Sequence, residues 1–373
     1  MPHSNKQVVS FFLTTKCNLC CDYCYNREER EKIVEQTLSF EIAKAGIDLF
    51  FSENISRHIR FYGPGEPTQE IKLMKQIVNY AYIVAGDKLT VELQTNGIFA
   101  EKDRDWLLNS INIMWISFDG EPDVHNAQRH FPDGSPTSPH IEKNIQWLVS
   151  HKKNKNFIVG ARVTITDKNV ERQKSMVDYF NNLGVMYIWS DPLFPSVGII
   201  PAYSDKIKMD EFRFNMDRYV DTYIEATQYA KEKGVFYGSF LTCNFDGKTN
   251  KHCRACTPVP HFTPDGYISA CDLVTFGENA YHMDCFVYGK WNEETQSFDF
   301  DEKKIKMLQN RSTDNMEHCK SCNVKQHCGG YCLGEVMNET NDMYGQKTIA
   351  CRAIKRLYNG IGSSDTPFPY MHP

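Results

Sequence analysis

The sequence predicts an α/β protein, a partial TIM-like (β/α)6 barrel followed by a smaller cysteine-rich domain. Three observations predict it: strand-like and helix-like segments alternate in the first half of the chain, ten of the 14 cysteines lie from Cys243 onward, and none lies between Cys24 and Cys243. Alternating strands and helices favour a parallel sheet covered by helices. About six such units fall short of the eight in a complete TIM barrel.

Each element follows from its local pattern. Short apolar runs rich in β-branched and aromatic residues predict strands, and apolar residues at helical spacing predict helices, the first with Ser39 as its N-cap. The expected strands are residues 8–14, 60–62, 89–93, 113–118, 157–165 and 185–189. The expected helices are residues 39–51, 71–84, 103–108, 141–149, 170–183 and 209–233, the last after a Pro/Gly-rich linker at 192–201. We expect two domains, residues 1–235 and 236–373.

Composition narrows the class of protein. A net charge of −5 gives no basic excess of the kind that nucleic-acid-binding proteins show. No apolar run approaches the roughly 20 residues that span a bilayer, and residues 1–7 contain no apolar signal core. We therefore expect a cytoplasmic protein with no nucleic-acid or membrane partner. In such a chain, many cysteines indicate metal or cluster ligation rather than disulfides.

The first cysteine group has a CxxxCxxC spacing through Cys17, Cys21 and Cys24. Three thiolates would bind three irons of a 4Fe–4S cluster and leave the fourth iron open to a ligand, whereas ordinary electron carriers use four cysteines. Cys20 is one position off this spacing, and we leave it out, although the sequence alone does not exclude it. With Tyr23 before the last cysteine, the group resembles the signature of the radical S-adenosylmethionine (SAM) superfamily. A zinc knuckle or incidental cysteines are the alternative.

This resemblance implies a specific chemistry. SAM would chelate the open iron through its amino and carboxylate groups, and its reduction would yield a 5′-deoxyadenosyl radical that abstracts hydrogen from the substrate. An external one-electron reductant of the flavodoxin or ferredoxin type is then required.

Two further motifs resemble those of this family. The segment 63–67, GPGEP, resembles the family's GGEP motif, with a proline where a glycine is usual. Gly63 and Gly65 would permit close backbone approach, and Glu66 offers an acceptor for the SAM ammonium. Thr95 and Asn96, in the polar turn after the third strand, are expected to line the same pocket.

The next two strands carry the remaining SAM candidates. Ser117 and Asp119, at the end of the fourth strand, resemble the residues that meet the SAM ribose. Arg129 and Arg162 are candidates for the SAM carboxylate, because an arginine fork suits a carboxylate. A plain turn for the first pair and a surface salt bridge for each arginine are the alternatives.

The C-terminal cysteines have the spacing of a SPASM domain, the auxiliary-cluster domain of radical SAM enzymes that mature peptides and proteins. The seven cysteines that match are Cys256, Cys271, Cys319, Cys322, Cys328, Cys332 and Cys351. Cys253 can supply an eighth thiolate, and Cys243 is its rival. The resemblance implies two auxiliary 4Fe–4S clusters, the first held by Cys253, Cys256, Cys271 and Cys332, the second by Cys319, Cys322, Cys328 and Cys351. Two zinc sites are the alternative, since CxxC pairs also suit zinc.

Over residues 9–355 the chain resembles anaerobic sulfatase-maturing enzymes and maturases of ribosomal peptides (RiPPs). The resemblance implies an oxidoreductase that modifies a peptide or protein, giving a crosslink, a thioether or an oxidised side chain such as formylglycine. Asp272 follows Cys271 where sulfatase maturases carry a catalytic base; a supporting carboxylate is the alternative. Only about eight residues precede the first strand, so we expect no added N-terminal peptide-recognition domain.

Two other functions remain open from the sequence. The first is an enzyme of the same superfamily that acts on a small molecule or a cofactor precursor. The second is a zinc-stabilised binding protein, which leaves the three-cysteine set unexplained.

Overall fold

The computed structural model describes residues 7–24, 26, 34–152, 157–193, 214–278 and 280–363. The strands are β1 (Val9–Phe12), β2 (His58–Tyr62), β3 (Thr90–Thr95), β4 (Ile113–Ser117), β5 (Ile158–Ile165), β6 (Tyr187–Pro192), β7 (Phe236–Gly238), β8 (His261–Phe262), β9 (Tyr267–Ser269), β10 (Val287–Asn292) and β11 (Ser297–Phe300). The helices are α2 (Phe40–Glu53), α3 (Ile71–Ala85), α4 (Arg104–Ser110), α5 (Pro122–Asn126), α6 (Ser138–His151), α7 (Gln173–Asn182), α9 (Met216–Lys233), α10 (Glu302–Asn310), α11 (Lys325–Cys328), α12 (Leu333–Thr340) and α13 (Thr348–Ile361).

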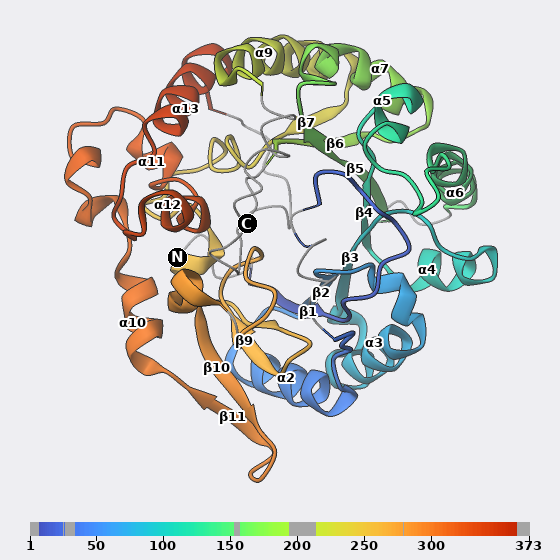
Figure 1. Ribbon diagram of the computed structural model, residues 1–373, viewed down its shortest axis with the longest axis vertical. Helices are drawn as coiled ribbons and strands as arrows, with labels where there is room; N and C mark the ends of the chain where they lie inside the picture. Colours follow the sequence, from blue (N-terminus) through green and yellow to red (C-terminus); the bar gives the residue numbers. More distant parts are fainter. Residues whose placement is uncertain are drawn as a thin grey trace.

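Strands β1 to β7 form a parallel sheet in sequence order, with helices outside it (Figure 1). This arrangement is typical of a partial TIM barrel and confirms the predicted fold class. All six predicted strands are present. The seventh, β7, was missed because a three-residue strand has too little sequence pattern to detect.

The C-terminal region extends the same sheet. β8 pairs in parallel with β1, and β8 to β11 then pair antiparallel to one another. The rings of Phe11 and Phe262 stack at 5.5 Å across this junction, and a Cβ on Gly46 of α2 would lie 2.5 Å from the Phe262 ring. The junction places the loop after β9, which carries Cys271, beside β1 and β2. The domain boundary near residue 235 stays a prediction.

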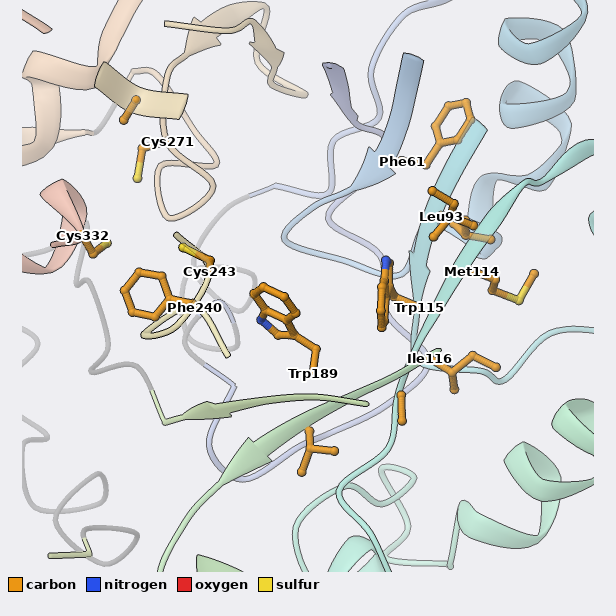
Figure 2. Close-up of a cluster of buried hydrophobic side chains, with 14 of the residues drawn as sticks. Phe61, Leu93, Met114, Trp115, Ile116, Trp189, Phe240, Cys243, Cys271 and Cys332 are labelled. Carbon is orange, nitrogen blue, oxygen red and sulfur yellow. The ribbon is translucent and has the colours of Figure 1, made fainter. Parts of the chain in front are cut away.

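The barrel strands separate two environments. Phe61, Leu93, Met114 and Ile116 point toward the helices, whereas Trp115 and Trp189 face the barrel interior (Figure 2). Gly160 of β5 provides room for one indole, because a Cβ there would lie 2.2 Å from the Trp115 ring. The helix-facing side chains form the apolar core, and the two indoles line the cavity described below.

The predicted helices are confirmed, with ends that differ by a few residues. Ser39 caps α2, since its hydroxyl accepts a hydrogen bond from the Ile42 amide at 3.1 Å. The expected linker and the expected start of the helix at 209 fall largely outside the described residues, and α9 begins at Met216. No helix in the described part of the chain is long and apolar enough to cross a membrane.

Candidate functional site

A cavity of about 320 Å³ lies at the carboxyl ends of the barrel strands. It brings together most of the residues singled out from the sequence: Cys17, Cys21, Tyr23, Cys24, Gly63, Gly65, Glu66, Thr95, Asn96, Ser117, Arg129, Arg162, Cys253, Cys271, Asp272 and Cys332. Neither Asp119 nor Cys256 lines it, and the cysteines predicted for the second auxiliary cluster lie elsewhere. One cavity therefore connects the N-terminal cysteine loop with part of the C-terminal cysteine region.

The N-terminal cysteine loop is held against the segment after α5. The amides of Cys20 and Asp22 donate to the carbonyls of His130 and Gln128 at 3.0 and 2.9 Å. Cys21 is buried, and this burial raises the pKa of its thiol to about 12; the Arg129 charge opposes the shift, and the neighbouring Cys24 and Cys17 thiols add to it. The three thiols predicted from CxxxCxxC thus lie near one another and line the cavity, and Cys20 does not line it.

The loop after β2 packs directly on the loop after β1. A Cβ on Gly65 would lie 2.2 Å from the Lys16 carbonyl oxygen, and the Glu66 amide donates to that same oxygen at 2.7 Å. Gly63 has a φ of +152°, and its Cβ position is 3.1 Å from Phe12 Cα. These glycines therefore let two stretches of protein backbone approach each other, next to Cys17.

Glu66 connects the ends of β2 and β3. Its Oε1 accepts from the Thr68 amide, the Thr68 hydroxyl and the Thr95 hydroxyl at 3.0, 2.7 and 2.7 Å, and its Oε2 accepts from the Asn96 amide at 2.6 Å. A carboxylate has about four lone-pair positions. Protein donors fill most of them, so Glu66 positions these loops, and its predicted contact with the SAM ammonium stays a prediction.

Tyr23 stands between Asp119 and Arg129. Its hydroxyl donates to Asp119 Oδ2 and accepts from Arg129 Nη1 at 2.6 Å. Asp119 is fully buried and also accepts from the Thr164 amide at 3.0 Å. Burial raises the pKa of Asp119, and the Arg129 charge opposes this shift. Tyr23 and Arg129 line the cavity and Asp119 lies behind them, so Asp119 orients Tyr23 in this structure.

Arg162 is paired with a carboxylate that the sequence analysis missed. Its Nη2 lies 3.3 Å from Asp191 Oδ2, and its guanidinium lies over the Trp189 ring at 5.5 Å from the centroid. Trp189 Nε1 donates to the same Asp191 oxygen at 2.7 Å. The signal that could have found Asp191 is a polar residue at the carboxyl end of the sixth parallel strand.

Asp272 faces the cavity in an ion pair with Arg60. The Arg60 Nη1 donates to Asp272 Oδ2 at 3.2 Å, and Nη2 donates to Oδ1. Burial alone would raise the pKa of Asp272. The Arg60 charge and, to a smaller extent, His261 outweigh burial and hold this pKa well below its usual range. A carboxylate paired in this way is a weak base, so the role predicted for Asp272 requires that Arg60 release it.

Arg254 is a second cavity residue that the sequence analysis missed. It lies in the short turn between Cys253 and Cys256 and lines the cavity near Asp272. Its buried Nε has no hydrogen-bond partner among the described residues. Burial and the charge of Arg60 lower the pKa of Arg254 to about 10, and the group remains charged at neutral pH. The only sequence signal was a cation inside a CxxC pair.

Three thiols of the first predicted auxiliary set, Cys253, Cys271 and Cys332, line the same cavity, and the fourth, Cys256, lies next to Cys253. The thiols of Cys253 and Cys256 interact; this interaction, opposed by burial and helped by the Arg311 charge, lowers the pKa of Cys256 to about 6 and raises that of Cys253. The thiols of Cys332 and Cys271 are close enough to Cys253 to raise its pKa. A Cβ on Gly334 would lie 3.1 Å from Cys271 Sγ and 3.7 Å from Cys332 Sγ. Two of the four thiols thus lie against Gly334, and the other two lie close to them.

The second predicted set also gathers, outside the cavity. Burial raises the pKa of Cys319 to about 11, and the nearby thiols of Cys351 and Cys322 add to this shift. Burial also raises the pKa of Cys328, and the thiols of Cys351 and Cys319 add to that shift. In the residues that the structure describes, no three His, Cys, Asp or Glu side chains converge tightly enough for a single metal ion.

Cys243, the rival of Cys253, lies in a different place. Its thiol is buried, 4.0 Å from His252 Nε2. His252 in turn contacts the Cys328 carbonyl at 2.7 Å. The structure therefore brings Cys253, rather than Cys243, beside the other three thiols of the first set.

One family model and several known proteins are similar to this chain. The model of the 4Fe-4S single cluster domain family matches residues 7–135. The radical SAM cyclopropyl synthase TigE of Paramaledivibacter caminithermalis is 22% identical over 94% of this chain and 73% of its own length. The serine-type anaerobic sulfatase-maturating enzyme of Bacteroides thetaiotaomicron is 19% identical over 95% of this chain and 87% of its own.

Two solved structures share the fold. The enzyme anSMEcpe with bound SAM (AdoMet) has a TM-score of 0.73 and 17% identity, covering 95% of this chain and 93% of the other. Streptococcus suis SuiB bound to its precursor peptide SuiA has a TM-score of 0.64 and 13% identity, covering 93% and 76%.

The fold, the cysteine spacing and the relatives define a radical SAM enzyme with a SPASM-like, cysteine-rich C-terminal domain. The chain resembles the anaerobic sulfatase-maturating enzymes and the peptide maturase SuiB. The matched family model is that of a 4Fe-4S single cluster domain, and anSMEcpe was solved with SAM bound.

Proposed function

We propose that this protein is a cytoplasmic peptide or protein maturase that carries three 4Fe–4S clusters. The observation that supports the proposal is that one cavity is lined both by Cys17, Cys21 and Cys24 and by thiols of the first auxiliary set. A substrate residue in that cavity would lie between the SAM site and an electron acceptor. When bound, SAM and its cluster supply a 5′-deoxyadenosyl radical that abstracts hydrogen from the substrate.

Thiol-only donor sets suit iron–sulfur clusters. Cys17, Cys21 and Cys24 would hold the cluster with the open iron. Cys253, Cys256, Cys271 and Cys332 would hold the first auxiliary cluster, and Cys319, Cys322, Cys328 and Cys351 the second. An external reductant of the flavodoxin or ferredoxin type would supply the electron for SAM cleavage.

The side chains around the N-terminal thiols would orient SAM. Arg129, held by Tyr23, and Arg162, held by Asp191, present guanidinium groups to the cavity from two sides. Either suits the SAM carboxylate. Thr95, Asn96 and Ser117 complete the polar wall at the ends of β3 and β4.

The opposite wall would orient the substrate. Arg254 presents a charged donor whose Nε has no partner in the described residues, and a peptide carbonyl or carboxylate would satisfy it. Asp272 lies beside it, in the position from which it could accept a proton in an oxidation such as formylglycine formation. Among similar structures, anSMEcpe was solved with the Cp18Cys peptide and SuiB with its precursor peptide, which favours a peptide over a small molecule.

Anaerobic reconstitution followed by iron and zinc analysis tests the cofactor part. We expect about twelve irons per chain and SAM-derived 5′-deoxyadenosine on reduction; zinc with little iron would overturn the proposal. Incubation with peptides encoded beside the gene, followed by mass spectrometry, tests the substrate part. A mass change in a small-molecule precursor and in none of the peptides would contradict it.

A further inference from the structure

Arg311, which directly follows α10, is one of the largest fully buried side chains of the described chain. Its guanidinium donates to three backbone carbonyls: Nε to Met343 at 2.9 Å, Nη1 to Tyr331 at 3.2 Å and Nη2 to Gly330 at 2.7 Å. Its fourth contact is a sulfur, Cys256 Sγ, 3.6 Å from Nη1. None of the ion pairs among the described residues involves Arg311.

A buried guanidinium remains charged, because arginine does not lose its proton in proteins. A buried charge without a counter-charge is strongly unfavourable, and carbonyl dipoles offset only part of this cost. Of the four acceptors around Arg311, only the Cys256 sulfur can carry a full negative charge. The nearby acid Glu335 is already paired with Lys347. The Cys256 sulfur is therefore the contact at which a negative charge would balance the Arg311 guanidinium.

The backbone around Arg311 is shaped to hold it there. Gly329, Gly330 and Tyr331 all have positive φ, 65°, 90° and 64°. They link Cys328 of the second thiol set to Cys332 of the first. A Cβ on Gly329 would lie 2.5 Å from the Lys251 carbonyl carbon, so glycine is required at this turn. This loop turns two carbonyls onto Arg311, which places the cation where the two cysteine sets meet.

We propose that Arg311 is the counter-cation of the cluster held by Cys253, Cys256, Cys271 and Cys332, and that its hydrogen bond to Cys256 raises the reduction potential of that cluster. This inference rests on the proposed function, since it requires a cluster at those thiols. The reduced cluster carries one more negative charge than the oxidised cluster, so a nearby cation stabilises the reduced form more. Net charge and hydrogen bonds to the sulfurs are established determinants of cluster potential.

Redox titration of the reconstituted full-length enzyme, followed by electron paramagnetic resonance with and without SAM, tests this proposal. Signals that SAM does not change belong to the auxiliary clusters. Arg311→Gln keeps hydrogen-bond donors but removes the charge, whereas Arg311→Lys keeps the charge. Arg104→Gln is the matched control, because Arg104 is also buried but contacts Asn144 and Glu101 rather than a cysteine.

At a fixed solution potential, we expect the reduced-to-oxidised ratio of one auxiliary cluster to fall at least about tenfold in Arg311→Gln, a shift of about 59 mV for one electron. It should change much less in Arg311→Lys and not in Arg104→Gln. Full iron content with an unchanged ratio in Arg311→Gln would overturn the inference, as would equal iron loss in Arg311→Gln and Arg311→Lys, which would show purely structural support. Absence of auxiliary iron from the wild-type enzyme would instead refute the proposed function.

Discussion

Arg60 of β2 and Asp272, 212 residues further along the chain, form a two-pronged ion pair at the cavity wall. Arg60 is buried, and its Nε also donates to the Ser10 hydroxyl of β1 at 2.9 Å. The pair thus connects the first two barrel strands to the loop that carries Cys271. It gives Asp272 a structural role in addition to the catalytic role predicted from the sequence. Different measurements test the two roles.

The catalytic role predicts a selective loss of product. Asp272→Asn keeps the shape but removes the basicity, so SAM cleavage should remain while product formation slows by on the order of 100-fold. Product and 5′-deoxyadenosine measured in the same reaction give the two rates. A variant that makes product at the wild-type rate would show that Asp272 is structural, and loss of iron would show that it supports the cluster.

The structural role predicts a pH dependence of stability. Because Arg60 holds the pKa of Asp272 below its unfolded value of about 3.9, the ion pair stabilises the fold above that pH and loses this effect as the pH falls through the folded pKa. The Asp272 side chain is 41% exposed, so we expect about 1 kcal/mol rather than the value of a fully buried pair. The stabilities of wild type and Asp272→Asn, measured by denaturation, should differ at pH 7, begin to converge below about pH 4 and become equal only as the pH falls through the folded pKa of Asp272. A difference independent of pH would contradict this interpretation.

The N-terminal cysteines offer a matched pair of variants. Cys21→Ala should abolish 5′-deoxyadenosine formation and remove about four of about twelve irons, because only the three-cysteine set leaves an iron open to SAM. Cys20→Ala should leave both unchanged, since Cys20 does not line the cavity. Iron analysis and chromatography of the nucleoside give the readout. Normal cleavage by Cys21→Ala would refute the assignment.

A second pair tests the eighth auxiliary ligand. Cys253 converges with Cys271 and Cys332, whereas Cys243 lies against His252. Cys253→Ala should therefore reduce the iron content or leave an altered auxiliary cluster, and Cys243→Ala should retain all three clusters. Mössbauer spectra of both proteins distinguish these outcomes. The reverse pattern would assign the ligand to Cys243.

Tyr23→Phe tests how Arg129 is positioned. Loss of the hydroxyl removes the hydrogen bonds to both Arg129 and Asp119, and we expect the Kd for SAM to rise about tenfold without loss of iron. Tyr179→Phe is the control, because that hydroxyl contacts Glu142 away from the cavity. Calorimetric titration with SAM measures both. Equal Kd values for the two variants would remove Tyr23 from the SAM site.

The sequence by itself determined the features that depend on neighbours in the chain. CxxxCxxC and the C-terminal spacing selected the candidate cysteine ligands, because ligands of one cluster often lie within a few residues of one another. The alternation of period-2 and period-3.6 segments identified the parallel barrel, because those periods decide which side of an element is buried.

Only the tertiary structure decided which of these residues line the cavity and which partners hold them. The Asp272–Arg60 pair, the Asp191–Arg162 pair and the contact of Arg311 with Cys256 each join residues 29 to 212 positions apart. Such pairs depend on strand register and on the β1–β8 junction, neither of which leaves a local sequence pattern. For the same reason Asp119, placed correctly at a strand end, lies behind Tyr23: its burial is set by side chains contributed by other elements, and those contacts exist only in the folded chain.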